Sequence, residues 1–308
     1  MSRPAVSDLE ATCVLPARAR LGECPTWSPD DARLYWIDID GRAIHRFDPA
    51  TGLDEQRPAP GRPGSLALTA TPGRLLVAIE GGLAFIDWPS GAWSHWVGLE
   101  PEGVGNRLND GRCDPAGRFW VGSMFDPAAA GKFTGLLHRV ELDGAAATVR
   151  SDIGVANGLG FAPDGRTMYF ADTLRDVVWA YDYDVDDGEA NNERVFLDFG
   201  PLPGRPDGAA VDEEGCYWIA CVTGSMVLRV TPAGAIDRRI RVPVSKPTMP
   251  AFGGPGFSTL FITTIGGGGS HQVDPSQPEA GGLFAVDAGV RGLAETRFAG
   301  GPTTAGAT

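Results

Sequence analysis

The chain has 308 residues, 43% of them hydrophobic, which suits a soluble globular protein with a large buried core. Its formal net charge of −13 argues against nucleic acid or an anionic membrane surface as a partner. No apolar run reaches the roughly 18 residues that a membrane helix needs, and the opening stretch MSRPAVSDLEATC lacks the apolar centre of a secretion signal.

Five cysteines are present, an odd number without the paired spacing of a metal site: Cys13, Cys24, Cys113, Cys216 and Cys221. Cys216 and Cys221 are spaced so that a strand would point them to opposite faces, which disfavours a disulfide between them. Reduced thiols and the absence of a targeting signal together predict a cytoplasmic protein.

Short β-rich runs separated by Gly, Pro and Asp turns follow one another along the chain, and helical periodicity is almost absent. Six runs end in a turn closed by glycine, at Gly52, Gly91, Gly144, Gly188, Gly234 and Gly289. A second series marks the start of an earlier strand in each unit, at Glu23, Ser65, Asn109, Asn157, Asp207 and Thr248. The second series advances by 42, 44, 48, 50 and 41 residues, so the chain repeats about every 45 residues.

Six repeats of three or four short strands predict an all-β chain folded as a six-bladed β-propeller. We expect residues 1–308 to form a single propeller domain. The segment at about residues 9–19, which contains EATCVL, precedes the first repeat and is predicted to close the last blade. Closure would leave no blade with a row of unpaired backbone groups at the junction.

The first strand of each blade lines the central channel, so residues at the same phase of the repeat face the same end of the axis. Glu23, Asn157 and Asp207 share this phase with Ser65, Asn109 and Thr248. Two carboxylates held close together repel each other, and a bound divalent cation would remove that penalty. Carboxylate and amide oxygens suit Ca²⁺ first, then Mn²⁺, Mg²⁺ or Fe²⁺, whereas Zn²⁺ more often takes nitrogen and sulfur ligands. The phase therefore predicts a central metal-binding channel.

Several stretches resemble the family of senescence marker protein, gluconolactonase and luciferin-regenerating enzyme, which are metal-dependent six-bladed propellers. They run in the expected order from LGECPTW at 21–27 to RPDGAAVDEEGCYW at 205–218, with NRLNDG, VGSM, ANGLGFAPDG and YFADT between them. The resemblance implies that Glu23, Asn157 and Asp207 are metal ligands. It also implies that Arg107 and Asn109 contact substrate hydroxyls.

Two positions depart from the family pattern. Cys24 stands where the family usually has glycine, which we interpret as a change in packing. The acidic substrate contact that follows VGSM in the family is matched here only by Asp126.

The hypothesis from the resemblance is hydrolysis of a sugar lactone to an aldonic acid, with one divalent cation as cofactor. Asp207 would act as both ligand and general base toward water. Two alternatives stay open: hydrolysis of other esters or organophosphates by the same site, and a non-catalytic calcium-binding propeller. The glycine-rich loop at 265–272 is either a lid or a plain surface loop, and His271 is a candidate to reach the pocket. The sequence leaves the particular sugar, the metal and the oligomeric state open.

Overall fold

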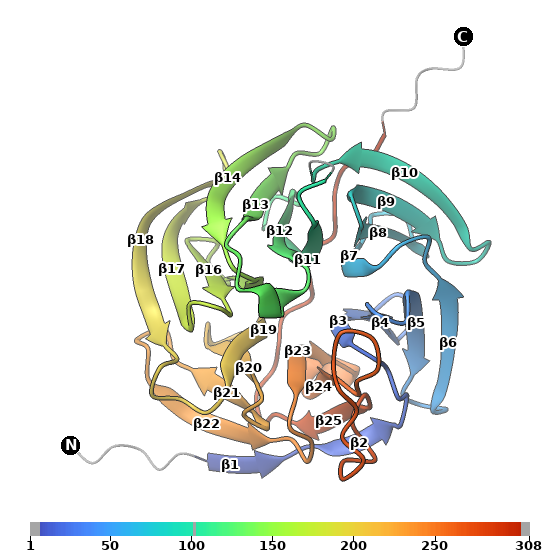
Figure 1. The fold of residues 1–308 in the computed structure, drawn as a ribbon. Helices are drawn as coiled ribbons and strands as arrows, with labels where there is room; N and C mark the ends of the chain where they lie inside the picture. Colours follow the sequence, from blue (N-terminus) through green and yellow to red (C-terminus); the bar gives the residue numbers. More distant parts are fainter. Residues whose placement is uncertain (1–6, 101–102, 303–308) are drawn as a thin grey trace.

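A computed structural model describes residues 7–100 and 103–302, which form six β-sheets arranged radially around one axis (Figure 1). The predicted six-bladed β-propeller is therefore confirmed. Within the described residues the only helical segments are two 3₁₀ turns, η1 (Ala128–Ala130) and η2 (Pro255–Phe257). None of the described helices has the length and hydropathy of a membrane span.

Each blade is a meander of strands that runs from the axis outward. Blade 1 holds β3 (Gly22–Ser28), β4 (Arg33–Asp38), β5 (Ala43–Asp48) and β6 (Leu53–Pro58). Blade 2 holds β7 (Pro63–Leu68), β8 (Arg74–Ile79), β9 (Gly82–Asp87) and β10 (Ala92–Gly98). Blade 3 holds β11 (Asn106–Cys113), β12 (Phe119–Phe125), β13 (Gly135–Val140) and β14 (Ala146–Ile153).

The other three blades follow the same plan. Blade 4 holds β15 (Ala156–Phe161), β16 (Thr167–Asp172), β17 (Val177–Asp184) and β18 (Glu189–Asp198). Blade 5 holds β19 (Arg205–Val211), β20 (Tyr217–Val222), β21 (Met226–Val230) and β22 (Ile236–Arg241), and blade 6 holds β23 (Pro247–Gly253), β24 (Thr259–Thr264) and β25 (Leu283–Asp287).

The N-terminal strands lie on the outside of two blades. β2 (Thr12–Leu15) pairs antiparallel with β25 and becomes the fourth strand of blade 6. β1 (Ser7–Glu10) pairs in parallel with β22 and adds a fifth strand to blade 5. The start of the chain thus bridges blades 6 and 5 and covers one sheet edge of each.

A buried aspartate fixes the turn between the first and second strands of a blade. In blade 5, Asp212 accepts the backbone N–H groups of Glu214 and Cys216 at 3.0 and 2.9 Å. Its other oxygen accepts Trp218 Nε1 at 2.9 Å and pairs with Arg229 Nε at 2.8 Å. This carboxylate therefore closes the DEEG turn. It also accepts the indole N–H of Trp218, which is buried between the blades and would otherwise lack a partner.

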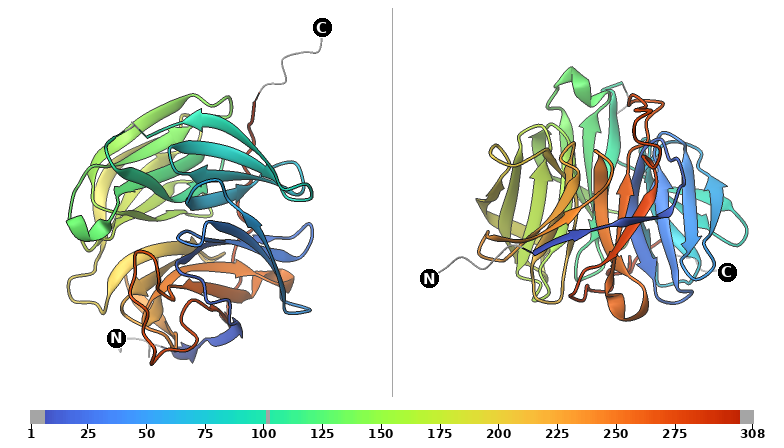
Figure 2. Two further views of the ribbon diagram at one scale, coloured as in Figure 1. Left: turned by 45° about the vertical axis from the view of Figure 1, so that its right-hand side comes forward. Right: turned by 90° about the horizontal axis from the view of Figure 1, so that it is seen from below.

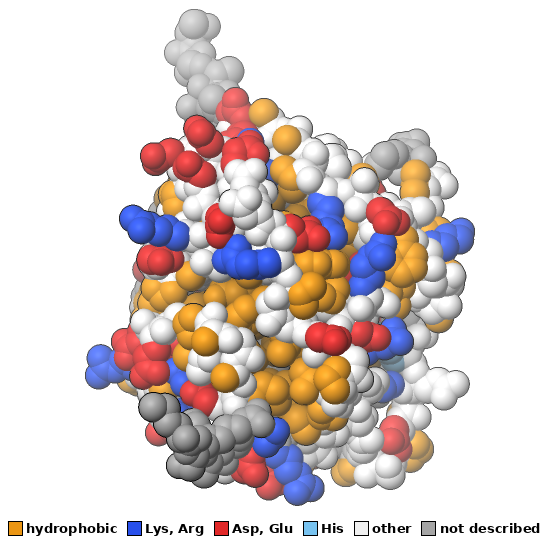
Figure 3. All heavy atoms as spheres, turned by 90° about the vertical axis from the view of Figure 1, so that its left-hand side faces the viewer, with side chains coloured by type: hydrophobic (Ala, Val, Ile, Leu, Met, Phe, Trp, Pro, Cys, Tyr) orange, Lys and Arg blue, Asp and Glu red, His pale blue; other side chains and the backbone are white. Residues whose placement is uncertain are grey.

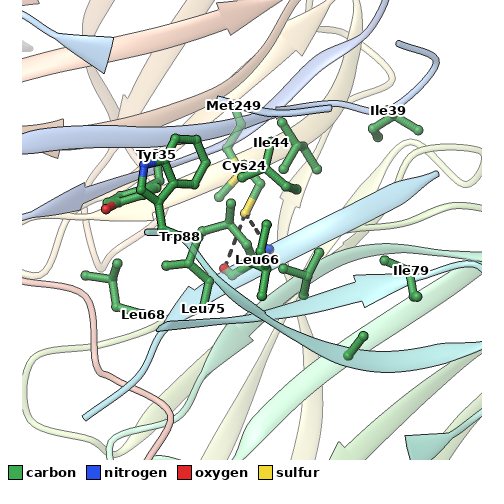
Figure 4. Close-up of a cluster of buried hydrophobic side chains, with 14 of the residues drawn as sticks. Cys24, Tyr35, Ile39, Ile44, Leu66, Leu68, Leu75, Ile79, Trp88 and Met249 are labelled. Atoms are coloured by element: carbon green, nitrogen blue, oxygen red, sulfur yellow. Dashed lines mark hydrogen bonds between the residues drawn. The ribbon is translucent and has the colours of Figure 1, made fainter. Parts of the chain in front are cut away.

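Apolar side chains fill the spaces between neighbouring blades. Between blades 1 and 2, Tyr35 meets Trp88 edge to face, with ring centroids 5.5 Å apart, within a cluster that also contains Leu66 and Cys24 (Figure 4). Blade contacts of this kind supply the core, since each sheet buries both faces against its neighbours.

Charged side chains of both signs are scattered over the outer side of the propeller that carries β14 and β18 (Figure 3). Arg150 of β14 pairs with Glu193 of β18 on this side. Val195 is 63% exposed between such charges, an isolated apolar side chain of the kind that ordinary surfaces carry.

Candidate active site

Antiparallel pairing decides which loops surround the site. The first strand of a blade starts where the second strand ends, as in the pairing of Gly22 with Asp38. The loops that follow the second strands therefore form a rim around the starts of the six inner strands. Two of these loops, residues 126–134 of blade 3 and 265–282 of blade 6, are long and project from the same face of the ring (Figure 2).

A β-bulge interrupts every inner strand at the phase that the sequence singled out. The register shifts between Glu23 and Thr26, and between Asn157 and Gly160. In β11, β19 and β23 the shift spans the phase residue itself, and in β7 it lies just before Ser65. Bulges re-aim side chains and occur beside active sites. Here they account for the turning of strand-start side chains toward the axis.

A cavity of about 360 Å³ lies inside this rim. Its walls include all six side chains that the sequence identified as candidate site residues: Glu23, Arg107, Asn109, Asp126, Asn157 and Asp207. Of the six residues at the common phase, Ser65 and Thr248 are the two that do not line it. Both are fully buried, and the hydroxyl group of Thr248 donates to Gly22 O at 2.6 Å.

Hydrogen bonds hold the amides and the guanidinium in a fixed arrangement. Arg107 Nη1 donates to Asn109 Oδ1 at 2.7 Å, and Asn109 Nδ2 donates to Asn157 Oδ1 at 3.1 Å. Asn157 Nδ2 in turn donates to Thr173 Oγ1 at 2.8 Å. Both ends of the Asn157 amide are therefore held, which fixes the position of its carbonyl oxygen at the cavity wall. The sequence analysis missed Thr173, although it belongs to the YFADT stretch that carried part of the resemblance.

Two carboxylates at the floor of the cavity have no cationic partner of their own. Asp207 is 7% exposed, and within the described residues neither Asp207 nor Glu23 forms an ion pair. Burial, and then the negative charges of Asp207 and Asp110, raise the pKa of Glu23 well above its usual range. Burial and the charge of Asp110 raise the pKa of Asp207 in the same way. The free pair is thus electrostatically strained.

A second set of charges lies deeper along the axis. Asp110 Oδ2 accepts the Leu159 N–H at 2.9 Å, whereas its buried Oδ1 has no partner within the described residues. Arg112 pairs with Glu295 at 2.5 Å and donates to Ala209 O at 2.6 Å. The bond from the Leu159 backbone gives Asp110 a structural role.

Glu295 belongs to the C-terminal strap, which we define as residues 290–301. The strap crosses the ring at the ends of the inner strands, opposite the cavity (Figure 1). It is anchored by a hydrogen bond from Phe298 N to Leu68 O at 2.8 Å and by the fully buried Phe298 ring. This end of the axis is therefore closed by the chain itself.

The donor set fits a hard divalent cation. Glu23, Asn157 and Asp207 offer oxygen atoms at the cavity wall, which suits such an ion. A bound dication would stabilise the ionised forms of the two carboxylates, whose pKa values are raised without it. Among the described residues no three His, Cys, Asp or Glu side chains form a metal-binding group. The candidate set differs from such groups because its third member is an amide.

The rim brings together residues that the sequence did not connect. Asp126 pairs with Arg62 of blade 2, which also binds Glu80 at 2.6 Å. Asp126 lines the cavity as a charged neighbour of Arg107, but its own partner is Arg62. No local pattern could have found this contact, since Arg62 lies 64 residues earlier in the chain.

The Cys24 departure has a backbone explanation. Cys24 has φ +48° at the bulge of β3, and Gly158 has φ +62° at the equivalent bulge of β15. Glycine adopts such angles without strain, which accounts for the family's preference at this position. The Cys24 thiol is 3% exposed and contacts Leu66, accepting its N–H at 3.2 Å (Figure 4). The expected packing role is consistent with these contacts.

The fold and the cavity define a six-bladed propeller with a pocket at one end of its axis, in which charged and amide side chains lie among apolar ones. Residues 21–266 match the model of the SMP-30/Gluconolactonase/LRE-like region, about four fifths of the chain. The chain therefore belongs to this family, and the resemblance in its sequence is confirmed.

Relatives of known name cover nearly the whole chain. A 6-deoxy-6-sulfogluconolactonase of Pseudomonas putida is 38% identical over 94% of this chain and 98% of its own length. An L-arabinolactonase of Azospirillum brasilense is 37% identical over 95% and 97% of the two chains. Among solved structures, a calcium-binding protein, regucalcin, from Agrobacterium tumefaciens superimposes with a TM-score of 0.89 at 29% identity, over 96% of this chain and 99% of that one.

Proposed function

We propose that this chain is a metal-dependent lactonase that hydrolyses a sugar lactone to the corresponding aldonic acid. The observation that carries the proposal is the cavity itself. It combines two unpaired carboxylates and an oriented amide with Arg107, a buried arginine that has no carboxylate partner within the described residues. Two of the three named relatives, those of Pseudomonas putida and Azospirillum brasilense, are named for lactone hydrolysis.

Glu23, Asn157 and Asp207 would hold the cation. When bound, it would supply an electrophile that stabilises negative charge on the lactone carbonyl or on a water molecule. The printed description of the Agrobacterium relative favours Ca²⁺, and Mn²⁺, Mg²⁺, Zn²⁺ and Fe²⁺ are the alternatives. The two buried carboxylates, Glu23 and Asp207, whose mutual repulsion helps to raise the pKa of Glu23, support a divalent ion over a monovalent one.

Asp207 is the proposed general base. Its carboxylate takes a proton from water as the water oxygen attacks the carbonyl carbon. The bond between that carbon and the ring oxygen then breaks, and the proton passes to the departing ring oxygen. One water is consumed, and the product is a hydroxy acid.

Arg107 and Asn109 are the proposed contacts for the sugar hydroxyls. Arg107 Nη1 donates to Asn109 Oδ1 at 2.7 Å and to Leu108 O at 3.1 Å. The other N–H groups of the guanidinium are left for substrate. Asp126 is a further proposed contact, held in place by Arg62. This polar wall favours a hydroxylated lactone over the apolar esters or organophosphates of the alternative hypothesis.

A non-catalytic calcium-binding role is the second candidate, because the description of the Agrobacterium relative names calcium binding. Acid release from a panel of aldonolactones, measured with Ca²⁺ or Mn²⁺ present, separates the two. Hydrolysis of at least one lactone above the spontaneous rate supports the lactonase. Tight Ca²⁺ binding without acid release from any lactone would favour the second candidate.

All five cysteines are free and four of them are buried, which supports our further proposal that the protein works in the reducing cytoplasm.

A further inference from the structure

Two loops from opposite blades face each other across the cavity. Residues 126–134 follow β12 in blade 3, and residues 265–282 follow β24 in blade 6. The other four blades use only two to four residues at this place, at 39–42, 80–81, 173–176 and 223–225. The long loops contribute Asp126 to Ala129 from one side, and Ile265, Ser270 and His271 from the other, to the cavity wall.

The blade 6 loop is tied down at the point where it reaches the cavity. Asp40 Oδ2 accepts hydrogen bonds from Ser270 N at 2.8 Å and from Ser270 Oγ at 2.6 Å. Gly268 N donates to His271 O at 2.8 Å, and Gly266 N donates to Ala19 O at 3.1 Å. These bonds fix the backbone on both sides of Ser270, so His271 has a defined position.

The imidazole of His271 is free to bind a ligand. His45 is bound to Asp54 at 2.7 Å and His138 to Thr148 at 3.2 Å, whereas the ring of His271 has no hydrogen-bond partner within residues 7–100 and 103–302. Burial and the positive charge of Lys246 lower the pKa of His271. The negative charges of Asp40 and Asp126 oppose this shift, whereas the positive charge of Arg107 adds to it. A neutral ring offers one donor and one acceptor, as a hydroxyl group does.

We propose that His271 is a specificity-determining residue whose ring hydrogen-bonds a hydroxyl on the exocyclic carbon of the lactone. The inference rests on the proposed lactonase function. A lactone bound with its carbonyl at the carboxylates and its ring hydroxyls at Arg107 would direct its exocyclic carbon toward the long rim loops. The opposite wall there is apolar, formed by Pro127, Ala128 and Ala129. A hydroxyl that contacted only this apolar wall would lose its hydrogen bonds to water and gain none from the protein.

The test compares two substrates that differ only in this group. The δ-lactone of gluconic acid carries an exocyclic hydroxymethyl group, and the δ-lactone of xylonic acid does not. We expect His271→Ala to lower kcat/KM about three- to tenfold on the gluconic lactone, mainly through KM, and less than about twofold on the xylonic lactone. His271→Gln, which keeps a donor and an acceptor, should recover part of the loss.

Two further variants separate a contact from a disturbed loop. Gln272→Ala changes the exposed neighbour of His271, outside the cavity wall, and should leave both rates unchanged. Asp40→Ala removes the anchor of Ser270 and should reproduce the selective loss. Equal losses on the two lactones, or no loss on either, would overturn the role of His271. A wild-type protein inactive on both lactones and on every other aldonolactone would overturn the proposed function, and this inference with it.

Discussion

Replacement of Asp207 by asparagine separates the proposed metal site from an ordinary structural carboxylate. Asparagine keeps the size and one carbonyl oxygen but removes one of the two negative charges at the cavity floor. At a typical Ca–O distance of about 2.4 Å, the attraction between a dication and one carboxylate is ~3.5 kcal/mol even with the dielectric constant of water. Loss of that attraction weakens binding about 300-fold.

The effect can be read from thermal unfolding. A ligand at 100 times its Kd stabilises a protein by about 2.7 kcal/mol. For 308 residues the entropy of unfolding is about 650 cal/mol/K, so saturating Ca²⁺ should raise the Tm of the wild-type protein by ~4 °C. The same Ca²⁺ concentration should raise the Tm of Asp207→Asn by less than about 0.5 °C.

The assay is differential scanning fluorimetry with chelator or with Ca²⁺, and Asp187→Asn is the matched control. Asp187 is exposed and its replacement changes the net charge equally. The control should keep the full Ca²⁺ response. An Asp207→Asn variant with a wild-type Ca²⁺ shift would refute the assignment of Asp207 as a ligand.

Three further outcomes follow from the same contacts. In steady-state assays, Arg107→Ala should raise KM for aldonolactones more than about tenfold and change kcat little. The reason is that the Arg107 guanidinium is proposed to bind substrate hydroxyls. In metal-free protein, Glu23 and Asp207 have pKa values raised by burial and by neighbouring negative charge. Their stabilising contribution is therefore full below pH ~4 and is lost as the pH rises through the raised values, which urea titrations at several pH values would detect. Phe298→Ala should lower the free energy of unfolding by about 3–5 kcal/mol, or ~5–8 °C in Tm, because the fully buried ring anchors the C-terminal strap.

Each of these outcomes has a result that contradicts it. An Arg107→Ala variant that loses kcat with unchanged KM would mean that Arg107 acts on the reacting atoms. Metal-free protein with flat stability from pH 4 to 8, by the same titrations, would mean that the carboxylate pair is not strained. A Phe298→Ala variant with wild-type Tm would mean that the strap contributes nothing to stability.

The fold could be predicted from local sequence because each blade repeats the same turn residues at nearly constant spacing. For this reason the sequence alone predicted the Asp-containing turns, such as the one at Asp212. It also predicted the shared phase of Glu23, Asn157 and Asp207. The bulges that turn those side chains could not be predicted, because the positive φ that Cys24 and Gly158 share is seen only in the structure. Only the chain geometry shows why glycine is usual there.

Contacts between blades could not be predicted, because no period relates their partners. Arg62 meets Asp126 across 64 residues, and Ser270 meets Asp40 across 230. Arg112 meets Glu295 of the strap across 183 residues. Each of these pairs joins a loop or tail of one blade to another blade. Rim loops and tails are thus the parts of the site that the repeat does not constrain.

The most direct test of the account is titration of metal-stripped protein with Ca²⁺, and in parallel with Mn²⁺, while acid release from an aldonolactone is followed. The stripped protein should show negligible hydrolysis, and the rate should rise to a plateau at one ion per chain for at least one of the two metals. Full hydrolysis by the stripped protein, with neither ion changing its rate, would contradict it.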